Sequence, residues 1–123
     1  MYRPPELSQW SAEIATHFPG LSRPMITGLA LWSLGMIILQ SCSLSSLADW
    51  WASRLKQGYH TVRERLRDLY REKEAKAGEH RCQLDVAACW APWLRWVLQD
   101  WTGTQLAIAL DATSLEDRFT VLS

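Results

Sequence analysis

The uncharged stretch from Pro24 to Ala48 constrains the fold more than any other feature, because so many apolar side chains must be shielded from water. Its apolar part, PMITGLALWSLGMIIL, ends at Leu39 and is followed by Gln40 and a serine-rich break. A membrane span needs about 20 predominantly apolar residues, so the shorter run favours a buried central helix. A small membrane protein anchored by residues 24–48 is the alternative.

Helix boundary signals surround this stretch. Residues 7–18 are predicted to form a short helix after a proline-bearing arm, and the Pro19-Gly20 pair should end it. The central helix is predicted to begin after Ser22, a suitable N-cap, with Pro24 in its first turn. It should run to about Ser41.

Two further helices are predicted after the serines. The first has an apolar side at helical spacing, made of Leu44, Leu47, Trp51 and Leu55. The short segment Gln57-Gly58-Tyr59 contains the glycine of a turn, after which Thr61 is a reasonable N-cap. The second helix, which Gly78 should end, has its own stripe: Val62, Leu66, Leu69 and Tyr70. Residues 44–72 are therefore a candidate helix–turn–helix.

The basic residues concentrate in this region. The formal net charge of the 123 residues is zero, but nine of the thirteen lysines and arginines lie between Arg54 and Arg81, against five acids. In a DNA-binding helix–turn–helix, the second helix enters the major groove with polar residues facing bases and phosphates. The residues predicted to do so are His60, Thr61, Arg63, Arg65, Arg67 and Arg71. The alternative is a solvated amphipathic helix whose arginines and glutamates pair along its surface.

A tryptophan-rich helix is predicted within residues 82–101. Trp90, Trp93, Leu94, Val97 and Trp101 share one side of it. We expect Trp93, Val97 and Trp101 to belong to the core, since a tryptophan stripe at helical spacing usually does. Pro92 should kink this helix or restart it.

The pattern then changes to that of a sheet. The run QLAIAL is short, continuously apolar and ends at Asp111, as expected of a strand buried on both faces. The segment ATSLED reads as a connection, and RFTVLS as a second strand. A carboxylate at the end of a buried strand can hold Mg²⁺, although Asp111 could equally cap a turn. Glu116 and Asp117 are interpreted as turn residues.

The cysteines give no site of their own. The odd set Cys42, Cys82 and Cys89 argues against a secreted disulfide framework and for a reducing cytoplasm. The spacing of His80 and Cys82 with Cys89 fits no zinc pattern.

The segment LAIALDATSLEDRFTVLS resembles the first catalytic block of bacterial insertion-sequence DDE transposases. In that block, a hydrophobic strand ends in the first acid of the catalytic triad, and Asp111 matches this acid. The upstream segments LALWSLGMIILQSCSL, TVRERLRDLY and DVAACWAPWLRWVL are also similar to such transposases. The resemblance extends from about Pro24 to Ser123.

The resemblance implies a mainly α chain with a helix–turn–helix-like hairpin, followed by a C-terminal β-hairpin that begins a truncated RNase H-like domain. The expected parts are an N-terminal arm and short helix (1–22), a helical DNA-binding region (23–81), and a connecting helix with the start of the catalytic domain (82–123). The full-length enzyme would bind the terminal inverted repeats of its element. It would then cleave and transfer DNA strands with Mg²⁺ or Mn²⁺.

Only Asp111 can be matched to the catalytic and metal-binding acids, so this fragment is expected to be inactive and to hold no metal tightly. The expected partner is DNA, with self-association through exposed strand edges and without a small-molecule substrate. The alternative outside the transposases is a stand-alone helix–turn–helix protein that binds DNA or another partner.

Overall fold

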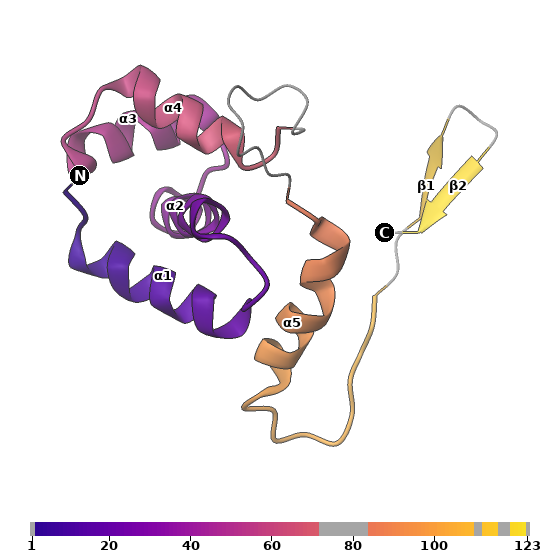
Figure 1. The fold of residues 1–123 in the computed structure, drawn as a ribbon. Helices are drawn as coiled ribbons and strands as arrows, with labels where there is room; N and C mark the ends of the chain where they lie inside the picture. Colours follow the sequence, from indigo (N-terminus) through magenta and orange to yellow (C-terminus); the bar gives the residue numbers. More distant parts are fainter. Residues whose placement is uncertain (1, 72–83, 110–111, 116–118, 123) are drawn as a thin grey trace.

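In the part of the chain that the structure describes, five α-helices are followed by two short strands (Figure 1). The computed structural model describes residues 2–71, 84–109, 112–115 and 119–122. The helices are α1 (Pro5–His17), α2 (Arg23–Leu39), α3 (Leu44–Leu55), α4 (Tyr59–Asp68) and α5 (Val86–Leu98). Figure 1 shows α2 at the centre, seen along its axis, with α1 on one side and α3 and α4 on the other. The expectation of a mainly α chain is confirmed.

Helix α2 is the central helix that the uncharged stretch predicts. Ser22 is its N-cap residue, Pro24 lies in its first turn, and it ends at Leu39, followed by Gln40 in the left-handed region at φ 51°. Ala30 and Leu31 are fully buried. Its last turn is not buried as a central helix was predicted to be, since Met36, Ile37 and Ile38 are exposed.

The described part of the chain contains no single helix long and apolar enough to cross a membrane. Helices α2 and α3 together reach that length and composition, but they are bent by 101° at the break between them.

Three tryptophans link neighbouring helices through their indole N–H groups. Trp51 of α3 donates to the carbonyl oxygen of Leu31 at 2.9 Å, and Trp32 of α2 donates to that of Leu66 in α4 at 2.8 Å. Trp10 of α1 donates to Ser33 Oγ at 2.7 Å. A buried indole needs such a partner. These contacts attach α1, α3 and α4 to α2, which explains how a small body accommodates large aromatic side chains.

Helix α1 packs on α2 through Leu7 and Ile14, both of which are buried. It begins two residues before the predicted start, at Pro5, because proline suits the first position of a helix. It ends at His17, just before the Pro19-Gly20 pair, as predicted. In the arm ahead of it, Arg3 donates to Thr27 Oγ1 of α2 at 3.4 Å.

Helix α5 corrects the prediction about the tryptophan stripe. The stripe exists, but it is not packed against the other helices. Trp93, Val97 and Trp101 are exposed, and Trp90 is 63% exposed. The opposite side packs on α1, where the ring of Trp96 stacks on that of His17 at 4.2 Å. The core beneath α1 is already closed by Leu7, Ile14 and Phe18. Trp96 of α5 therefore packs on α1, whereas the apolar stripe of α5 finds no uncovered apolar surface there.

Two local expectations for α5 also have an outcome. The helix continues through Pro92 without a restart. Its N-cap is Asp85, whose carboxylate accepts a hydrogen bond from the backbone N–H of Ala88 at 3.2 Å. The helix therefore begins at Val86, four residues after the start of the predicted segment.

The C-terminal segment differs from the predicted order of strands. Residues 105–109, predicted to be an interior strand, have no regular secondary structure, and Ile108 is 80% exposed. A strand needs a neighbour for its backbone groups, and no described segment lies beside this one as a strand. Instead, β1 (Ala112–Leu115), in the predicted connection, pairs antiparallel with β2 (Phe119–Leu122). Within the described residues, these strands contact each other and no helix.

Candidate nucleic-acid interface

Helices α3 and α4 form the predicted two-helix unit. Only residues 56–58 separate them, and Gly58 is the N-cap of α4 in place of the predicted Thr61. Lys56 adopts the left-handed conformation, at φ 55° and ψ 44°, which ends α3. A turn of three to four residues, often with a glycine, joins the helices of a helix–turn–helix. The local geometry therefore fits this motif.

Apolar side chains on one side of α3 and one side of α4 pack these two helices against the rest of the protein. In α3, the predicted face is confirmed, with Leu47, Trp51 and Leu55 buried. In α4, Val62 and Leu66 are fully buried. Because this side of α4 points inward, the opposite side of the helix faces solvent.

The end of the predicted α4 stripe is only partly confirmed. Leu69 packs against Gly28 of α2. Tyr70 is exposed, and its ring makes a T-shaped contact with the ring of Trp32. The difference arises because α4 ends at Asp68, well before the predicted stop at Gly78. Gly78 lies outside the described residues.

The predicted DNA-contact residues lie on or beside the solvent side of α4. His60 and Thr61 are exposed in its first turn. Arg63, Arg65 and Arg67 are partly exposed along the helix, and Arg71 follows its end. The structure therefore brings the six residues to one short element, but it does not leave the arginines as independent cations.

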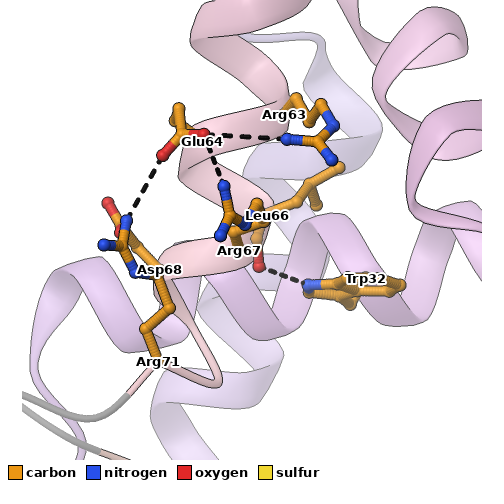
Figure 2. Close-up of polar contacts among 7 residues, drawn as sticks. All are labelled: Trp32, Arg63, Glu64, Leu66, Arg67, Asp68 and Arg71. Atoms are coloured by element: carbon orange, nitrogen blue, oxygen red, sulfur yellow. Dashed lines mark hydrogen bonds and ion pairs between the residues drawn. The ribbon is translucent and has the colours of Figure 1, made fainter. Parts of the chain in front are cut away.

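Glu64 is a functional candidate that the sequence prediction did not select. Its Oε1 atom accepts from Arg67 at 3.0 Å and lies 3.8 Å from Arg63, and its Oε2 atom lies 3.3 Å from Arg71 (Figure 2). Asp68 adds a second contact to Arg71, at 3.5 Å. The spacing from Glu64 to Arg67 is a readable sequence signal. The contact between Glu64 and Arg71 could not be predicted from the sequence, because it depends on the path of the chain beyond α4.

Within the described residues, the electrostatic result is a compact cluster of three guanidinium groups and two carboxylates. Glu64 contacts Arg63, Arg67 and Arg71, and Asp68 contacts Arg71. Guanidinium groups suit both carboxylate and phosphate oxygens. The cluster therefore has the chemistry of a site for an anion more negative than a single carboxylate.

The predicted catalytic and metal-binding residue, Asp111, lies outside the described residues, as do Glu116, Asp117, His80 and Cys82. Among the residues that the structure describes, no three His, Cys, Asp or Glu side chains gather as metal ligands. Burial raises the pKa of the Cys89 thiol, and the charge of nearby Asp85 adds to that rise.

The chain was also compared with known proteins. No protein-family model matches it, and no curated protein or solved structure is significantly similar to it.

Proposed function

We propose that α3 and α4 are the DNA-binding unit of an insertion-sequence DDE transposase and that α4 contacts the ends of the element. The observation that carries this proposal is the pairing of a three-residue turn with a solvent-facing row of basic side chains on the second helix. The resemblance of the sequence to this family names the partner. We expect the protein to act in the cytoplasm.

The beginning of α4 adds electrostatic support. Its N-cap, Gly58, supplies no side chain to accept the first backbone N–H groups of the helix. Such groups, at the positive end of the helix dipole, attract phosphate oxygens. His60 and Thr61 stand beside them and can donate to the same anion. Phosphate contacts here would anchor the start of the helix, and the arginines farther along it would contact further phosphates.

The double substitution R63A/R67A is expected to weaken binding to an element-end duplex about 10- to 100-fold near 0.1 M salt. Two lost phosphate contacts should also lower the slope of log K against log salt by about 1.8. Fluorescence anisotropy over a salt series measures both quantities. Both side chains are partly exposed, so the fold should be retained, which circular dichroism would check.

The matched control is R23A/R95A, which removes the same charge from exposed positions on α2 and α5. It should leave the affinity nearly unchanged. An equal loss in both double variants would mean that net charge, rather than α4, determines binding, and would contradict the proposal. Fractionation of the wild-type protein with membranes would instead favour the anchor formed by residues 24–48.

We further propose that β1 and β2 begin an RNase H-like sheet and that Asp111, which directly precedes β1 in the chain, is its first catalytic acid. In such a site the carboxylates supply oxygen ligands to two divalent ions, and Asp111 would contribute one of these ligands. This role is supported by the resemblance of residues 106–123 to the first catalytic block of insertion-sequence DDE transposases.

The 123-residue chain is expected to leave supercoiled plasmid intact in Mg²⁺ or Mn²⁺, because one matched acid cannot clamp two metal ions. Gel electrophoresis of the plasmid would detect nicking. The Asp111→Ala variant should behave in the same way as the wild-type chain. Nicking that disappears in this variant would show that the chain already holds a working site.

A further inference from the structure

The carboxylate of Glu64 lies at the centre of the solvent side of α4. Val62 and Leu66 define the inward side, and at 3.6 residues per turn Glu64 projects almost directly away from them. Its side chain is half exposed. Any DNA that reaches the outward side of α4 must therefore meet this carboxylate as well as the arginines around it.

The guanidinium groups converge on Glu64 from both directions along the chain. Arg63 is its neighbour, Arg67 lies one turn further, and Arg71 approaches from beyond the helix end (Figure 2). Arg71 also contacts Asp68 at 3.5 Å, but its guanidinium group, like those of Arg63 and Arg67, lies beside the Glu64 carboxylate. Three guanidinium groups directed at one carboxylate also suit an anion with several charged oxygens.

We propose that Arg63, Arg67 and Arg71 form a phosphate-binding site that Glu64 occupies in the free protein. The carboxylate keeps the guanidinium groups directed toward one point and opposes the entry of other anions. A single DNA phosphate has one charge and two free oxygens, as the carboxylate does, but neighbouring phosphates of the same strand add theirs, and together they displace the carboxylate. Glu64 thereby lowers the affinity of α4 for DNA in general. This regulatory role rests on the proposed function, but the anion site does not.

The experiment uses Glu64→Gln, which keeps the size of the side chain and removes its charge. The control is Glu6→Gln, which makes the same substitution at an exposed position on α1, outside the proposed DNA-binding unit. The DNA probe is a mixed-sequence duplex of 20 base pairs, measured by anisotropy over a salt series. E64Q should bind about tenfold more tightly near 0.1 M salt, with a slope steeper by about 1, as expected for one additional phosphate contact. E6Q should bind as the wild type does.

A second probe, inorganic pyrophosphate, tests the site without DNA. It should raise the melting temperature of E64Q at a concentration several-fold lower than the wild type requires. The double variant E64Q/R67A should lose this response. If E64Q responds to pyrophosphate but no variant binds the duplex, the anion site is retained and the proposed DNA function fails.

Two results would overturn the inference. Equal behaviour of E64Q and E6Q toward both probes would mean that only the net charge of the protein matters. Weaker duplex binding by E64Q, without a change in its pyrophosphate response, would mean that Glu64 makes a favourable contact with a base. A carboxylate that accepts from a cytosine amino group would have that effect.

Discussion

Replacing Trp51 with alanine is expected to lower the free energy of unfolding by about 3–5 kcal/mol, enough to unfold much of a small helical body. The side chain is 1% exposed and is the largest fully buried one among the described residues. Its removal leaves a cavity between α2 and α3 and takes away the donor to the Leu31 carbonyl. Urea denaturation followed by circular dichroism would measure the change.

Trp90→Ala is the matched control, since it removes the same side chain from an exposed position on α5. It should change the stability by less than about 0.5 kcal/mol. Trp51→Phe separates the two contributions at the buried site, because it retains most of the apolar volume and loses the hydrogen bond, at a cost of about 1 kcal/mol. Comparable losses from Trp51→Ala and Trp90→Ala would contradict the assignment of Trp51 to the core.

The helical body could be predicted from the sequence because its signals are local and agree with one another. The apolar side of α3 and the Val62–Leu66 pair of α4 follow from periodicity alone. The absence of charge from residues 24–48 identified the central helix. In each case, neighbouring helices could cover the apolar side chains.

Periodicity identified the right stripe on α5 but could not say what it faces. A regular apolar side predicts burial only when the body has uncovered apolar surface of matching size. Here α1 already covers that part of the core, so Trp96 docks on His17 while Trp93 and Val97 remain in solvent. Whether a core is already filled is a property of the whole fold and cannot be read from one helix.

The run at residues 105–109 failed as a strand for a related reason. Apolar and β-branched residues indicate a preference for a sheet, but a strand exists only where another strand pairs with it. The described residues offer it no such partner, and pairing begins instead at β1. The candidate interface shows the same limit, since basic residues could be counted from the sequence but their convergence on Glu64 depends on side-chain positions in space.

Replacing Gly35 with alanine is expected to destabilise the protein by about 1–3 kcal/mol, although alanine favours a helix over glycine by about 1 kcal/mol. A Cβ atom at this position of α2 would lie 2.9 Å from Trp51 Nε1 and 3.1 Å from a side-chain carbon of Leu47. The indole cannot move aside without giving up its hydrogen bond to Leu31. The substitution therefore has to push α3 away from α2, which thermal unfolding would detect.

Gly28→Ala, two turns earlier in α2, is the matched control. A Cβ atom there would lie 3.0 Å from Leu69 Cδ1 and 3.3 Å from Leu69 Cβ, and Leu69 lies just past the last residue of α4. Rotation of the Leu69 side chain and a small shift at this end of α4 relieve both contacts, so the gain in helix propensity should offset most of the cost and leave the stability within about 1 kcal/mol of the wild type. If Gly35→Ala and Gly28→Ala had the same melting temperature, the close approach of α3 to Gly35 would not be what keeps α2 and α3 in contact. A lower melting temperature for Gly35→Ala alone would confirm that the Trp51–Gly35 contact sets the position of α3, and with it the position of α4.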